Sequence, residues 1–93
     1  MRLLLAEDDR KVSDFVARGL RAERFAVDLA FDGQSACEFA ASFPYDAIIL
    51  DLMLPVLNGT EVLKRIRRQT PDVPVLILTA KDDTAAKVEN FEA

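Results

Sequence analysis

The sequence predicts one small α/β domain, built from a parallel sheet with helices on both faces. Short apolar runs alternate along the chain with segments in which apolar residues recur at helical spacing. Three of these runs are apolar at every position, which is typical of strands buried on both faces of a parallel sheet. The chain has 93 residues, of which 51% are hydrophobic, so it can form one packed core but not two.

The same pattern gives each element its expected limits. Strands are expected, in chain order, over residues 3–6, 25–30, 47–50 and 75–78. The second of them alternates between large apolar and small or polar residues, so it should lie at an edge of the sheet. Helices are expected over 10–23, over 33–42, between the loop 55–59 and Pro71, and from 84 to 93. Asp9 is the expected N-cap of the first helix, whose buried stripe should comprise Val12, Phe15, Val16, Gly19 and Leu20.

Composition argues against several classes of function. The net charge of −4 disfavours a nucleic-acid-binding surface in this segment. No apolar run approaches the roughly 18 residues of a membrane span, and Met1-Arg2 leads directly into the first strand, so we expect a cytoplasmic protein without a membrane partner. Cys37 is the single cysteine, so no internal disulfide can form, and it should be a small buried hydrophobe. The lack of histidine removes histidine-based catalysis and most zinc sites.

Polar side chains follow three of the predicted strands, at the point where each strand ends. Glu7, Asp8 and Asp9 follow the first strand, Asp51 follows the third, and Thr79 follows the last. Ligands of open parallel sheets bind at the carboxyl ends of the strands. If these strands are neighbours, several carboxylates and one hydroxyl meet in a small volume.

Clustered carboxylates repel one another unless a cation lies between them. A hard divalent ion such as Mg²⁺ suits oxygen ligands, and one carboxylate would remain free to attack a phosphoryl group. The ordinary interpretation is that acidic residues at strand ends are solvated or cap helices. For Glu7, Asp8 or Asp9 taken alone we favour that interpretation, but the coincidence at three strand ends favours a site.

Four segments resemble the receiver domain of bacterial two-component response regulators in both order and spacing. They are Leu5–Asp9, Ile48–Pro55, Asn58-Gly59 and Pro74–Ala80. The pattern Asp-x-Met-x-Pro followed by glycine is a specific signal, and the resemblance covers residues 1–93. Asp28 and Asp46 resemble the OmpR/PhoB-type subclass, in which a winged-helix DNA-binding domain follows the receiver.

The resemblance implies a flavodoxin-like (CheY-like) fold with strand order 2-1-3-4. The family has a fifth strand and a fifth helix, which this chain is expected to lack. Residues 1–93 would then be a C-terminally incomplete receiver domain, without the DNA-binding output domain.

The resemblance also implies roles for individual residues. Asp51 would be the phosphoacceptor and Thr79 the switch hydroxyl. Glu7, Asp8 and Asp51 would bind Mg²⁺ together with the backbone carbonyl of Met53.

One family residue has no counterpart in this chain. The fifth strand of the family ends in a lysine that is followed by proline, and the chain stops before both. Lys81 is the nearest substitute, but the resemblance places it in a variable loop after Thr79. We therefore do not expect it to serve the phosphoryl group, which would lack one counter-charge.

The expected function is to accept a phosphoryl group from a sensor histidine kinase and to control a transcriptional output domain, through which alone DNA would be bound. Such a phosphoacceptor assists its own phosphorylation and is not a turnover enzyme. A haloacid dehalogenase-type phosphatase is an alternative, but it needs a second aspartate where this chain has Met53. A further alternative is an inherited receiver fragment that acts only in interactions. It would self-associate through the exposed edge of strand 75–78.

Overall fold

The structure is a computed structural model that describes the backbone of residues 1–82 and 85–91 and the side chains of residues 1–78. Its elements are β1 (Arg2–Ala6), α1 (Arg10–Ala22), β2 (Ala26–Ala30), α2 (Gly33–Ser42), β3 (Ala47–Asp51), α3 (Gly59–Gln69), β4 (Val75–Asp82) and β5 (Ala85–Phe91). The first seven agree with the elements expected from the sequence to within a few residues, because apolar strand runs and helix caps mark their ends.

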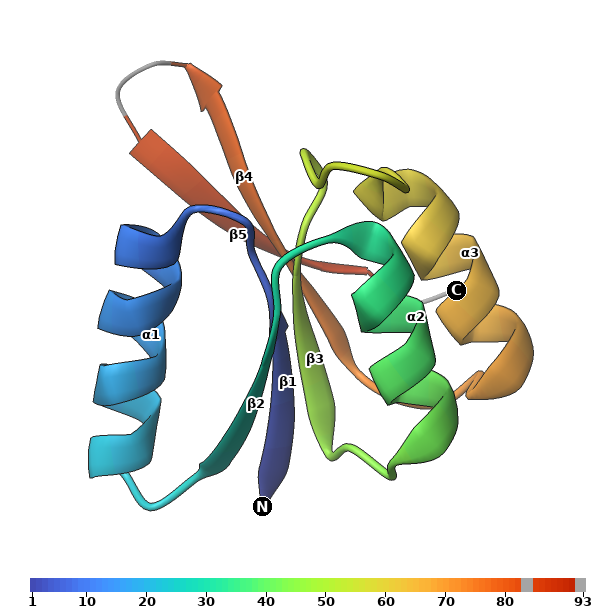
Figure 1. Ribbon diagram of the computed structural model, residues 1–93, viewed down its shortest axis with the longest axis horizontal. Coiled ribbons are helices and arrows are strands. Elements are labelled where there is room, and N and C mark those ends of the chain that lie inside the picture. The colour runs from blue at the N-terminus through green and yellow to red at the C-terminus, as the bar shows by residue number, and fades with distance from the viewer. Residues whose placement is uncertain (83–84, 92–93) are drawn as a thin grey trace.

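The strands form one sheet in the order β2-β1-β3-β4-β5. The first four are parallel, which confirms the predicted order 2-1-3-4. Helix α1 covers one face of the sheet, and α2 and α3 cover the other (Figure 1). Strand β2 lies at an edge, as its alternating pattern predicts.

The prediction of a helix from residue 84 onward is wrong for residues 85–91, the part of that segment that the structure describes. Residues 85–91 instead form β5, which pairs antiparallel with β4 from Val75↔Phe91 to Asp82↔Ala85. The expectation that β4 would be an exposed edge is wrong for the same reason. A helix of so few residues is marginal without a surface to pack against. The unpaired N–H and C=O groups of β4 offer the segment a complete set of hydrogen-bond partners.

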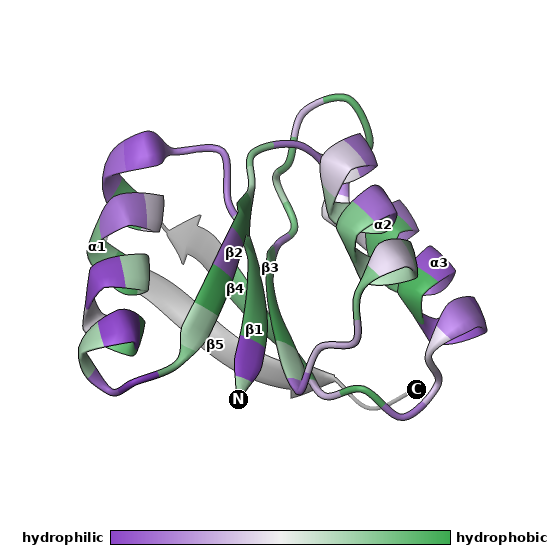
Figure 2. Cartoon of the chain, turned by 60° about the horizontal axis from the view of Figure 1, so that its bottom comes forward, coloured by the Kyte–Doolittle hydropathy of each residue, from purple (hydrophilic) through white to green (hydrophobic). Residues whose placement is uncertain are grey.

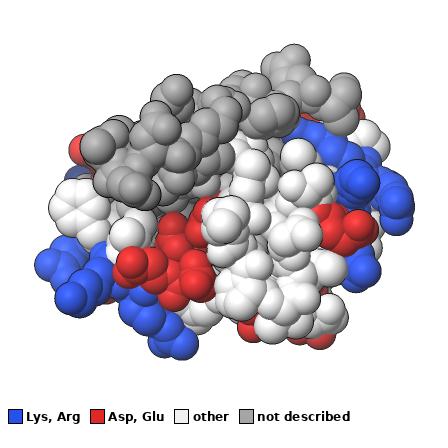
Figure 3. Space-filling model, turned by 90° about the horizontal axis from the view of Figure 1, so that it is seen from above, with Lys and Arg blue, Asp and Glu red and all other residues white. Residues whose placement is uncertain are grey.

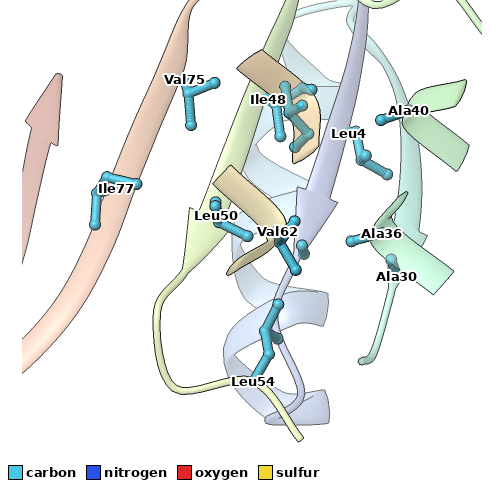
Figure 4. Packing of buried hydrophobic residues seen from close by; sticks show 12 residues of the cluster. Leu4, Ala30, Ala36, Ala40, Ile48, Leu50, Leu54, Val62, Val75 and Ile77 are labelled. Atoms are coloured by element: carbon cyan, nitrogen blue, oxygen red, sulfur yellow. The ribbon is translucent and has the colours of Figure 1, made fainter. Parts of the chain in front are cut away.

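The core has two parts, one on each face of the sheet. The larger lies between the sheet and helices α2 and α3, where Leu4, Ile48 and Leu50 are almost fully buried (Figure 4). The smaller lies under α1 and includes Leu5 and Val27. Figure 2 shows the same division, with apolar strands between helices whose outer faces are hydrophilic. Cys37 is only half-buried and packs against the larger part, consistent with a packing role.

Helix α1 begins as predicted, and its inner face matches the predicted stripe only in part. Asp9 caps it by accepting hydrogen bonds from the N–H groups of Lys11 and Val12. The predicted Val16 and Leu20 do pack against the smaller part of the core, but the fully buried side chains are Ser13 and Ala17. Phe15 is 79% exposed, so its assignment to the core is wrong. Serine and alanine carry little hydropathic signal, and the sequence pattern therefore favoured Phe15 over them.

Replacing Ser13 with alanine should stabilise the domain by about 1 kcal/mol. The Ser13 hydroxyl is fully buried and makes no hydrogen bond within the described part of the chain, while alanine is also the better helix former. Chemical denaturation of both proteins measures the difference. A loss of stability in Ser13→Ala would show that the hydroxyl has a partner, such as a buried water.

Candidate metal centre

Three carboxylates converge at the carboxyl edge of the sheet. Glu7 and Asp8 follow β1, Asp51 ends β3, and one oxygen from each lies within 4.8 Å of the others. They meet because β1 and β3 are neighbours in register, with Ala6 opposite Leu50. Figure 3, which views this edge from above, shows acidic side chains gathered in a patch with basic side chains on one side and uncharged ones on the other.

The cluster is partly withdrawn from water. Glu7 is 6% exposed and Asp51 is 9% exposed, whereas Asp8 is open to solvent. Burial raises the pKa of the Glu7 carboxyl to about 7, with a smaller contribution from the negative charge of Asp51. The hydrogen bond that Glu7 accepts from the Asp9 N–H, at 2.9 Å, acts in the opposite direction. Near neutral pH Glu7 is therefore partly protonated, and a cation bound at the cluster would favour its charged form.

The donor set suits a small, hard cation. All three side chains offer carboxylate oxygens, the ligand type that Mg²⁺ prefers. In an octahedral shell with bonds of about 2.1 Å, opposite oxygens lie about 4.2 Å apart and adjacent oxygens about 3.0 Å apart. At least two of the three pairs must be adjacent, so oxygens within 4.8 Å of one another reach a single ion once the side chains move closer together.

The loop after β3 fixes the direction of the Asp51 carboxylate. The N–H group of Met53 donates a hydrogen bond of 3.0 Å to Asp51 Oδ1. The Met53 side chain itself is 78% exposed. The backbone of Met53 thus borders the site, while the role expected for its carbonyl stays a prediction.

The same loop contains a strained turn centred on Val56. This residue has a φ of 72°, and the Leu57 N–H donates to the Pro55 carbonyl across it at 2.8 Å. A positive φ is unfavourable for a β-branched residue. The Val56 side chain is 80% exposed, so packing of that side chain does not explain the strain. Strain of this kind persists where surrounding contacts determine the backbone.

Two glycines lie against this loop. A Cβ added to Gly59 would be 2.4 Å from Leu52 Cα, so the two backbones approach closely there. A Cβ added to Gly33 would be 1.7 Å from the Leu57 carbonyl oxygen. Sequence alone does not indicate this contact, because nothing local to Asp32-Gly33 shows that α2 will meet a distant loop.

The other residues singled out in the sequence have mixed outcomes. The Asp9 carboxylate caps α1 and is not among the three that converge. Thr79 lies in β4 directly after Leu78, the residue in register with Asp51. The side chains of Thr79 and Lys81 lie outside the described residues.

No helix in the described part of the chain is long and apolar enough to cross a bilayer.

Comparison with known proteins agrees with this arrangement. A family model described as the response regulator receiver domain matches residues 3–93. The transcriptional regulatory protein QseB of Haemophilus influenzae is 45% identical over all 93 residues, and the chain spans 42% of its length.

Two solved structures are similar to this chain in fold and sequence. The receiver domain of the sensor histidine kinase PA1611 from Pseudomonas aeruginosa, with magnesium in its active-site cleft, has a TM-score of 0.84 and 36% identity, over 86% of this chain and 67% of that one. A response regulator from Burkholderia pseudomallei, with a phosphorylated aspartic acid and a calcium ion, has a TM-score of 0.81 and 26% identity. That match covers 87% of this chain and 48% of the other.

The metal-free protein should lose stability as the pH rises from about 5 to about 7. The pKa of Glu7 is about 7 in the folded chain against an ordinary value of 4.5, so the folded state binds more protons than the unfolded state in this range. The free energy of unfolding then falls with increasing pH. Denaturation at a series of pH values, with and without the substitution Glu7→Gln, measures this slope.

Glu7→Gln should flatten the slope, because glutamine cannot titrate. Asp14→Asn is the matched control, since Asp14 is exposed and paired with Arg18 at 2.6 Å, away from the cluster. Equal slopes in the wild type and in Glu7→Gln would contradict the raised pKa.

Proposed function

The chain belongs to the response-regulator receiver-domain family, and on that premise we propose that Asp51 accepts a phosphoryl group beside a Mg²⁺ ion bound by the acidic cluster. The observation that carries the proposal is the convergence of Glu7, Asp8 and Asp51, with Asp51 at the end of a central strand. The magnesium ion in the PA1611 receiver and the phosphorylated aspartic acid in the Burkholderia regulator support it.

Asp51 is the best nucleophile of the three carboxylates. Its orientation is set by the Met53 N–H, which aims the group without using a side chain. Glu7 is more deeply placed and also accepts the Asp9 N–H, so it is suited to hold the ion. Asp8 is open to solvent and can complete the ligand set from outside.

In the proposed reaction, an Asp51 oxygen attacks phosphorus in line with the leaving group of the donor. The new P–O bond forms as the donor bond breaks, and the leaving group takes the bonding electron pair. Mg²⁺ supplies the positive charge that such a transfer requires. We further propose that the Met53 carbonyl is a ligand and that the Thr79 hydroxyl contacts a phosphoryl oxygen, as the family resemblance implies.

The donor and the output are proposals about the whole protein. We propose a sensor histidine kinase as donor, a cytoplasmic location, and a transcriptional output through a DNA-binding domain, because QseB is a transcriptional regulatory protein. The protein would be a phosphoacceptor and not a turnover enzyme. A haloacid dehalogenase-type reaction needs an acid at position 53, which is methionine.

Asp51 should be the only residue that gains a phosphoryl group from a small donor such as acetyl phosphate in Mg²⁺. Intact-mass measurement before and after treatment detects the gain. Asp51→Asn should abolish it, and Asp8→Asn should weaken Mg²⁺ binding. Asp14→Asn should change neither. Phosphorylation that persists in Asp51→Asn, or an unchanged Mg²⁺ affinity in both site variants, would refute the proposed site.

A role in interactions alone is the second candidate function. Pairing through an open β4 edge no longer supports it, because β5 occupies that edge. The observation that does favour association is the exposed apolar surface of α1, where Phe15 is 79% and Val12 38% exposed. Scattered exposed hydrophobics are ordinary, but a phenylalanine this open on a helix is a suitable contact for a second copy.

Self-association should therefore depend on α1. Sedimentation velocity between about 10 and 100 µM should show a weight-average mass that rises with concentration, and Phe15→Ser should reduce the rise. A Kd near 1 µM leaves little monomer at the upper concentration. A monomer at every concentration would contradict the expectation, whereas association unaffected by Phe15→Ser would place the contact elsewhere.

A further inference from the structure

The segment between Asp51 and α3 is held in place by backbone contacts from two helices. Gly59, at the start of α3, donates its N–H to the Leu52 carbonyl at 3.0 Å. Gly33, at the start of α2, donates its N–H to the Pro55 carbonyl at 3.1 Å. The Pro55 carbonyl also accepts the Leu57 N–H of the strained turn. One oxygen thus joins the first residue of α2 to the turn that follows the phosphoacceptor.

Glycine at position 33 is not explained by backbone conformation. No glycine in the described part of the chain has a positive φ, so another residue could adopt the same dihedral angles. Glycine is also a poorer helix former than alanine. What position 33 does require is space. A Cβ there would lie 1.7 Å from the Leu57 carbonyl oxygen and 2.6 Å from its carbonyl carbon, and both atoms are backbone that cannot rotate away.

Gly33 does not itself lie among the converging carboxylates, so any influence must pass through the loop. Displacement of the Leu57 peptide would move Pro55, which is two residues from Met53. The Met53 N–H orients the Asp51 carboxylate. The strain at Val56 indicates that the loop is held in this conformation by its contacts and would not adopt it alone.

We propose that Gly33 is a positioning residue for the metal and phosphoacceptor site: its close contact with Pro55 and Leu57 lets the N-terminus of α2 set the position of the Met53 backbone and hence of Asp51. This inference rests on the proposed function for its consequence, the affinity for Mg²⁺. The effect of Gly33 on the Met53 backbone does not depend on metal binding, and it can be measured in the metal-free protein.

The test compares two glycine-to-alanine substitutions in helices. Gly33→Ala should lower Mg²⁺ affinity by about tenfold, as is usual when a partner outside the ligand shell is disturbed. It should also shift the Met53 amide resonance in two-dimensional NMR of the metal-free protein. Gly19→Ala is the control, since nothing lies within 4 Å of an added Cβ there. It should raise the unfolding midpoint and leave both the affinity and the Met53 resonance unchanged.

A second variant approaches the loop from its own side and does not add an atom to the interface. Val56→Gly relieves the positive φ, so the unfolding midpoint should rise while Mg²⁺ affinity stays close to that of the wild type, because the Gly33 contact is intact. If Gly33→Ala does not fold, the double variant Gly33→Ala/Val56→Gly lets the loop move away from the new Cβ and should fold. Lower Mg²⁺ affinity in the double variant than in Val56→Gly supports the proposal, and equal affinity in the two overturns it.

The outcomes separate this inference from the proposed function. If the wild type binds no Mg²⁺ and takes no phosphoryl group, the proposed function fails, and the Met53 resonance alone then decides the positioning role. A Met53 resonance that is the same in Gly33→Ala and the wild type overturns the inference, as does an unchanged Mg²⁺ affinity in a folded Gly33→Ala.

Discussion

Two nearly buried carboxylates, Glu7 and Asp51, face each other across the carboxyl ends of β1 and β3. Placing like charges together with little water is unfavourable, so the rest of the fold has to hold them there. The fully apolar strands do this from below, because Leu4, Leu5 and Leu50 have no exposed surface and fix β1 beside β3. The raised pKa of Glu7 is a direct consequence of that placement.

Each of the two carboxylates accepts a hydrogen bond from a nearby backbone N–H group. The Asp9 N–H serves Glu7, and the Met53 N–H serves Asp51. The Asp9 side chain turns the other way and caps α1. Each of these contacts comes from the residue two positions after a strand-end carboxylate, so both loops satisfy their carboxylates in the same local manner. The cluster is therefore arranged by short loops on a rigid sheet, which is the condition for precise placement of ligands.

The elements that the sequence predicted are those whose cause is local. Apolar runs identified the parallel strands, Asp9 identified the start of α1, and acidic residues after adjacent strands identified the converging carboxylates. The features that sequence analysis missed depend on contacts between distant segments. Residues 85–91 became a strand because the β4 edge was available, and Gly33 acquired its importance only where α2 meets the loop before α3. Phe15 was misplaced because the most buried residues of α1, Ser13 and Ala17, carry too little hydropathic signal to be recognised.

The antiparallel attachment of β5 also bears on how the domain assembles. Its pairing with β4 joins segments that are adjacent in the chain, whereas the pairing of β1 with β3 joins Ala6 to Leu50. Contacts between remote segments form slowly, because a long loop must close before any contact compensates for its lost entropy. The carboxylate cluster is built across this long-range pairing, and charge repulsion between its members opposes the same step. Nucleation can therefore begin in the β4–β5 hairpin, while the edge of the sheet that holds the carboxylate cluster belongs to the part of the fold that closes late.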